Sequence, residues 1–160
     1  MRLPSETSRR ETVARFSATM LLGLVLLLCG PLAAAQNTLG ELLDAGARKL
    51  SAAEFKDELV QRVLVGPMGS RGNVEVVYTT RGAVQGTAFS PPPIRHFPLS
   101  GTWNIDDQGT VCVTLRITSL NAAESLPPRC QFWFKHGGEY FLADSDWDRS
   151  SVVLRRTVKQ

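Results

Sequence analysis

The sequence has little of the two residue types that most often build catalytic and metal sites. It contains two histidines, His96 and His136, and three cysteines. Neither histidine has a second ligand at the spacing that a helix or a strand would give a metal site. No serine stands in the Gly-x-Ser-x-Gly elbow of many hydrolases. The sequence therefore predicts no metal and no cofactor, and it favours a protein that is not an enzyme.

An acidic segment near the C-terminus has only part of a calcium-binding pattern. Asp144, Asp146 and Asp148 alternate as the first ligands of a calcium loop do. Arg149 stands where such a loop needs glycine for its sharp turn, and Arg155 replaces the closing carboxylate. We interpret the segment as an acidic surface turn.

The first 35 residues have the pattern of a cleavable signal peptide. Four arginines precede an apolar run from Met20 to Leu28, and small residues follow up to Ala35. An uncleaved anchor is the alternative, but the run is shorter than the about 20 apolar residues that span a bilayer. We predict cleavage after Ala35, a periplasmic or secreted protein, and no stable membrane anchor after cleavage.

The predicted mature chain, residues 36–160, has almost no net charge. Its 14 basic and 13 acidic side chains leave a net charge of about +1, so the basic pI of the whole chain owes much to the leader. Binding to nucleic acid needs a basic face, and this balance does not provide one. We expect no nucleic-acid partner.

Only Cys112 and Cys130 remain after cleavage. An even pair in an oxidising compartment predicts a disulfide, and the pair lacks the close spacing of a redox-active dithiol. If the two cysteines face each other on adjacent antiparallel strands, they can bond. If the strands instead pair as far as Ile117, the two cysteines lie too far apart to bond. We favour the first register.

The mature chain begins with a predicted helical segment over residues 36–65. Thr38 with Glu41, and Ser51 with Glu54, form two capping boxes. The leucines after the first box, and then Phe55, Leu59 and Val63, have the spacing of one helical face. We expect two short helices, or one broken near Ser51, that pack against the remainder of a single structural domain.

Residues 66–160 have the alternation and turn signals of an antiparallel β domain. Val111, Val113, Leu115 and Ile117 alternate with more polar residues, as in a sheet covered on one face. Six or seven short strands are expected. The fold class is therefore mainly β (α+β): short N-terminal helices followed by an antiparallel β-meander or a partly closed lipocalin-like barrel.

Aromatic side chains are concentrated in this β-rich part. Strand alternation points Phe132 and Phe134 one way and Trp133 the other. A pocket in a curved sheet could hold a small apolar ligand, but aromatic packing in a small core is the commoner arrangement. The candidates for either role are Trp103, Phe132, Trp133, Phe134 and Tyr140.

The order of these signals resembles the DUF995 family of small exported bacterial proteins of unknown function. The residues that carry the resemblance are Gly101-Thr102-Trp103, Gly109-Thr110-Val111-Cys112, Cys130, Gly137-Gly138 and Tyr140. The resemblance covers roughly residues 51–141 and implies neither a catalytic residue nor an activity. Trp103 and Cys112 also fit the outline of exported inhibitors of bacterial metalloproteases, which are similar small β-barrels with a disulfide.

These patterns predict an exported, non-catalytic domain. Its partner would be a small apolar ligand or an exported protein. A periplasmic protease-inhibitor-like protein, whose N-terminal segment from Gln36 occupies an enzyme cleft, is the alternative.

Overall fold

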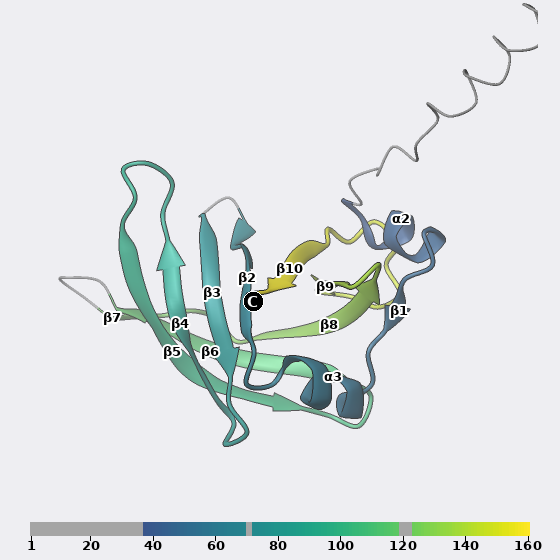
Figure 1. Cartoon of the computed structure of the whole chain (residues 1–160), viewed down its shortest axis with the longest axis horizontal. Coiled ribbons are helices and arrows are strands. Elements are labelled where there is room, and N and C mark those ends of the chain that lie inside the picture. Colours follow the sequence, from purple (N-terminus) through teal and green to yellow (C-terminus); the bar gives the residue numbers. More distant parts are fainter. Residues whose placement is uncertain (1–36, 70–71, 119–122) are drawn as a thin grey trace, which may run out of the picture. The chain divides into compact units, whose positions relative to one another are not determined.

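The computed structural model describes residues 37–69, 72–118 and 123–160 (Figure 1). The predicted signal peptide, its cleavage site and Gln36 lie outside the described residues. Within the described residues, no helix is long and apolar enough to cross a membrane.

Two short helices begin at the predicted capping boxes. In α2 (Leu39–Asp44) and α3 (Ala52–Leu59), the side chains of Thr38 and Ser51 accept hydrogen bonds from the backbone of the glutamate three residues on, and each glutamate accepts one in return. These bonds satisfy donors that every helix start leaves free. Both predicted boxes are confirmed.

The segment 36–65 is less helical than predicted. Strand β1 (Arg48–Lys49) separates the two helices, and strand β2 begins at Val63. Helix α3 ends at Leu59 because Val60 is already extended and Gln61 has a φ of 66°. The prediction that Leu59 and Val63 lie on one helical face was therefore wrong. The β domain starts at Val63 rather than at Gly66.

The remaining chain is an antiparallel sheet that closes on itself. It comprises β2 (Val63–Pro67), β3 (Asn73–Tyr78), β4 (Ala83–Phe89), β5 (His96–Ile105), β6 (Thr110–Thr118), β7 (Ala123–Ser125), β8 (Arg129–His136), β9 (Glu139–Ala143) and β10 (Leu154–Val158). The order is β1-β8-β9-β10-β2-β3-β4-β5-β6-β7, and a further pairing of β8 with β6 closes an eight-stranded barrel. The predicted barrel is thus confirmed and is closed, with more strands than the six or seven expected.

The seam between β6 and β8 is short. The strands pair only from Thr110 to Val113 on β6, and further along the same edge β6 pairs with β7. Cys112 lies directly opposite Cys130 in this seam, and the two form a disulfide. The favoured register is confirmed, and the bond joins the two strands that close the barrel.

One end of the barrel is filled by α3 and an aromatic cluster. Phe55 of α3 has its ring centre 5.5 Å from those of Tyr78 and Trp103 and 5.4 Å from that of Trp133. Phe55 and Leu59 are almost wholly buried in the main core. The helix therefore closes this end, which we term the closed end (Figure 1).

A second core lies outside the barrel wall. Leu39 and Leu42 of α2 pack with Phe134, Phe141 and Val153. Phe134 on β8 and Phe141 on β9 occupy the opposite phase of their strands from Trp133 and Leu142, which belong to the main core, and Val153 lies just before β10. Helix α2 thus covers an outer apolar patch that would otherwise face water.

Close approach of neighbouring strands requires glycine on β5. A Cβ added at Gly101 would lie 1.9 Å from the backbone oxygen of Thr114 on β6, a separation that no side chain can occupy. Glycine at an inward position lets a sheet curve sharply enough to close.

Candidate functional site: a cavity inside the barrel

A cavity of about 700 Å³ lies inside the barrel beside the aromatic cluster. It falls within the range of pockets that enclose small organic ligands. Most of its wall is aliphatic and comes from the inward positions of β3, β6, β9 and β10. These side chains are Val74, Val76, Val113, Leu115, Leu142 and Leu154.

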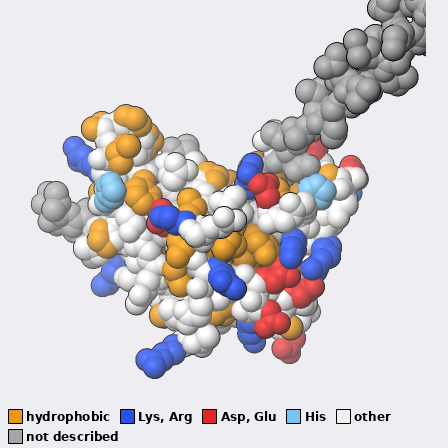
Figure 2. Space-filling model, viewed as in Figure 1, with side chains coloured by type: hydrophobic (Ala, Val, Ile, Leu, Met, Phe, Trp, Pro, Cys, Tyr) orange, Lys and Arg blue, Asp and Glu red, His pale blue; other side chains and the backbone are white. Residues whose placement is uncertain are grey.

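Loops and strand ends surround the open end of this cavity. Met68 and Gly69 come from the β2–β3 connection, and Leu126, Pro127 and Pro128 come from the segment before β8. Val152, in the segment before β10, also lines the cavity and is 69 % exposed. Hydrophobic side chains gather around β10 in the middle of the face shown in Figure 2.

Tyr78 is the link between the cavity and the closed end. Its ring packs on Phe55, Trp103 and Trp133, and the residue also lines the cavity. Burial raises the pKa of Tyr78 to about 12, so the hydroxyl remains neutral at all physiological pH values. None of the described hydrogen bonds involves this hydroxyl. Because no fully buried side-chain oxygen of the described residues lacks a partner, the hydroxyl keeps some accessible surface.

Arg156 is the one buried charged residue of the described chain, and it lines the cavity. Only 7 % of the residue is exposed. Its Nη1 donates to the backbone oxygens of Pro67, at 2.8 Å, and Arg155, at 3.0 Å. Burial lowers the pKa of the guanidinium, but arginine starts so far above neutrality that it stays positively charged.

Gly66 provides the space for this arginine. Extension of the β10–β2 register, in which Thr157 faces Val65, places Gly66 opposite Arg156. A Cβ at Gly66 would lie 2.7 Å from Nη1 of Arg156 and 2.3 Å from the backbone oxygen of Arg155. Any side chain at this position would therefore push against the guanidinium and the neighbouring strand.

The other charged groups that line the cavity are already paired. Arg129 donates to Asp144 at 2.7 Å, and the Gln131 side chain donates to the other oxygen of the same carboxylate at 2.9 Å. This pair is more than half exposed, so it contributes little to stability. Its two charges cancel, and Arg156 alone gives the cavity lining a net positive charge.

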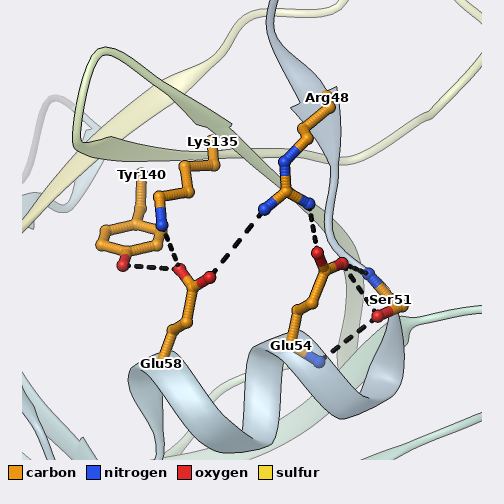
Figure 3. Close-up of polar contacts among 6 residues, drawn as sticks. All are labelled: Arg48, Ser51, Glu54, Glu58, Lys135 and Tyr140. Atoms are coloured by element: carbon orange, nitrogen blue, oxygen red, sulfur yellow. Dashed lines mark hydrogen bonds and ion pairs between the residues drawn. The ribbon is translucent and has the colours of Figure 1, made fainter.

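A second polar cluster lies at the closed end, between α3 and strands β1, β8 and β9 (Figure 3). Glu58 accepts hydrogen bonds from Lys135 at 2.7 Å and from the Tyr140 hydroxyl at 2.8 Å. Arg48 pairs with Glu54, which also caps α3 through Ser51. Figure 2 shows acidic side chains over α3, beside basic ones.

The acids of this polar cluster are stabilised in their charged form. The Lys135 ammonium is the main cause of the lowered pKa of Glu58, and hydrogen bonds from Ser51 lower the pKa of Glu54 to about 2. Every acid drawn in Figure 3 thus has its partners within the protein. We interpret the cluster as a brace that holds α3 against the barrel.

The five aromatic candidates from the sequence have different positions, and none lines the cavity. Trp103 and Trp133 belong to the aromatic cluster at the closed end, and Tyr140 is part of the main core and donates to Glu58 in the brace on α3. Phe132 and Phe134 point outward into the core under α2, opposite to Trp133, as the alternation predicts. The cavity is lined by aliphatic residues and by Arg156, which the sequence analysis did not identify.

The sequence pattern of β10 could have identified Arg156 as a candidate site residue. Leu154, Arg156 and Val158 share one face of the strand, and Leu154 and Val158 pack against the main core. An arginine between two core positions on one strand face is unusual enough to mark a candidate site. His96 lies against Phe89, and the described part of the chain has no cluster of three or more His, Cys, Asp or Glu residues that could hold a metal.

Comparisons with protein-family models, with curated proteins and with solved structures gave no match to this chain. The resemblance to the DUF995 family therefore stays a prediction.

Proposed function

We propose that this chain is an exported, non-catalytic binding protein that holds one small, largely apolar ligand inside its barrel. The observation that carries the proposal is the cavity of about 700 Å³ with aliphatic walls. Protein interiors are normally packed as densely as organic crystals, with few voids larger than a water molecule. An eight-stranded barrel has an interior of the width that holds one small ligand.

The proposed location is the periplasm or the extracellular space. The disulfide between Cys112 and Cys130 is compatible with an oxidising compartment. The signal-peptide pattern of residues 1–35 supports the same location and predicts a mature N-terminus at Gln36. Membership of the DUF995 family would agree with this proposal.

A ligand is favoured over an exported protein as the partner because the cavity gives it a specific place. The inhibitor alternative depends on a segment that begins at Gln36, outside the described residues. No observation in the described chain favours it over the cavity.

The test is binding of a neutral apolar fluorescent probe, N-phenyl-1-naphthylamine, to the purified mature protein. We expect saturable binding of one probe per chain. Leu115→Trp fills the cavity from β6 and should weaken probe binding at least tenfold. Thr114→Trp adds a tryptophan to the exposed outer face of the same strand and should bind the probe like the unmodified protein.

Two results would contradict the proposal. One is a folded protein that does not bind the probe at all. The other is equal binding by the two tryptophan variants, which would place the probe outside the barrel. A melting curve for each variant checks that the barrel is intact.

A further inference from the structure

We infer that the ligand is a single-chain amphiphile whose acidic head group pairs with Arg156 and whose apolar chain extends toward Tyr78. This inference rests on the proposed function, and it adds the chemical class of the ligand and the residue that recognises it.

The first argument is the unpaired charge of Arg156. Among the residues that the structure describes, no carboxylate lies within salt-bridge distance of its guanidinium, whereas the eight described ion pairs all involve other basic side chains. Burial of a cation destabilises the folded protein unless an anion or a full set of hydrogen bonds offsets it. Two backbone oxygens contact only Nη1. An anionic ligand would supply the missing partner.

The second argument concerns the guanidinium nitrogens of Arg156 that make no hydrogen bond to the described residues. Both bonds from the guanidinium use Nη1, so Nε and Nη2 have no partner among the described residues. No fully buried side-chain nitrogen of these residues lacks a partner, so Nε and Nη2 must keep some accessible surface, and the residue lines the cavity. Nε and Nη2 together form one side of the guanidinium fork, which binds the two oxygens of a carboxylate in parallel.

The backbone bonds also hold the fork in place. Nη1 is fixed to Pro67 and Arg155, and the missing side chain of Gly66 leaves room for the guanidinium beside β2. An arginine that is positioned before the ligand arrives loses less entropy on binding. The structure thus presents a fixed donor pair in an apolar wall, where a charged hydrogen bond is strongest.

The third argument is the length of apolar wall beyond this arginine. Gly66, opposite Arg156, pairs with Val74 on β3, and Tyr78 lies four residues further along the same strand. At about 3.3 Å per residue, the backbone of β3 extends ~13 Å from Val74 to Tyr78. Val76, Val113 and Leu142 line the space. An alkyl chain has the chemistry of this wall.

The experiment compares three ligands with the same chain: dodecanoate, dodecyl phosphate and dodecanol. Dissociation constants are measured by displacement of N-phenyl-1-naphthylamine and by calorimetry, below the critical micelle concentration. We expect the unmodified protein to bind dodecanoate at least tenfold more tightly than dodecanol. Dodecyl phosphate shows whether the site prefers a planar carboxylate or accepts any acidic head group.

The matched variants are Arg156→Met and Arg155→Met. Methionine replaces the long side chain of Arg156 without the charge. Arg156→Met should therefore bind all three ligands with the affinity that dodecanol has for the unmodified protein. Arg155 is the outward neighbour on the same strand, with a side chain that is 58 % exposed and pairs with Glu139. Arg155→Met should keep the preference for dodecanoate.

The inference is overturned if the unmodified protein binds dodecanol as tightly as both acidic ligands, or if Arg156→Met keeps the preference. If Arg156→Met does not fold, Arg156→Lys retains the charge without the fork, and an unchanged dodecanoate affinity in that variant would exclude paired binding by Nε and Nη2. Failure of the proposed function looks different, because then neither dodecanol nor the neutral probe binds at all.

Discussion

The closed end of the barrel and the cavity differ in how completely their side chains are packed and their charges are paired. At the closed end, Phe55 fills the space between Tyr78, Trp103 and Trp133. Glu54 and Glu58 of α3 are paired with Arg48 and Lys135. In the cavity, apolar walls face open space and Arg156 has no counter-ion among the described residues. The difference supports the proposal that the closed end serves stability and that the cavity binds a ligand.

The largest effect is expected from opening the closed end. Phe55→Ala removes the ring at the centre of the aromatic cluster and should lower the free energy of unfolding by about 3–5 kcal/mol. Val152→Ala, at the exposed side of the cavity, should change it by less than ~0.5 kcal/mol. Urea unfolding followed by tryptophan fluorescence measures both. Similar losses in the two variants would show that stability is not concentrated at the closed end.

The next effect concerns the seam beside the cavity wall. Because β6 and β8 pair over four residues only, loss of the disulfide removes a main link across this seam. We expect Cys112→Ala and Cys130→Ala each to reduce stability by about 3 kcal/mol, and the double variant to be no worse. Thermal melting checks this. Losses that add in the double variant would argue against a shared bond.

The smallest effect is expected from the brace on α3. The folded-state pKa of Glu54 is lowered to about 2, chiefly by hydrogen bonds from Ser51. A lowered pKa contributes stability above the unfolded value near 4.5, and this contribution is lost as the pH falls toward 2. Glu54→Gln should therefore be less stable than the unmodified protein at pH 6, and the gap should close between pH 4.5 and pH 2.

Melting temperatures of both proteins across this pH range provide the measurement. Asp57→Asn, a change at an exposed acid on the same helix, serves as the control. A gap that stays constant down to pH 2 would mean that the Glu54 carboxylate does not support the helix through its charge.

Local patterns predicted the parts of this fold that depend on neighbouring residues. Both capping boxes and the alternation of Val111, Val113 and Leu115 need only short stretches of sequence, and both were confirmed. The start of β2 was missed because Phe55, Leu59 and Val63 keep helical spacing across a helix end. Only the extended Val60 and the positive φ of Gln61 break the helix there.

The cavity could not be predicted because it depends on long-range pairing. Arg155 and Arg156 are adjacent basic residues, and only the alternation of Arg156 with Leu154 and Val158 distinguishes them in the sequence. Their difference arises when β10 pairs with β2 and β9, which turns Arg156 inward opposite Gly66 and leaves Arg155 outside. The aromatic candidates do not line the cavity, because their rings pack at the closed end or in the core under α2, which is the commoner of the two roles considered for them.

The most direct test of the central claim is an NMR titration of methyl-labelled protein with dodecanoate. The account predicts intermolecular nuclear Overhauser effects from the alkyl chain to the methyl groups of Leu115, Leu142 and Leu154, which line the cavity. Leu39 and Leu42, which lie in the separate core under α2, should show none. Contacts to Leu39 and Leu42 without contacts to the cavity leucines would contradict the assignment of the barrel interior as the binding site.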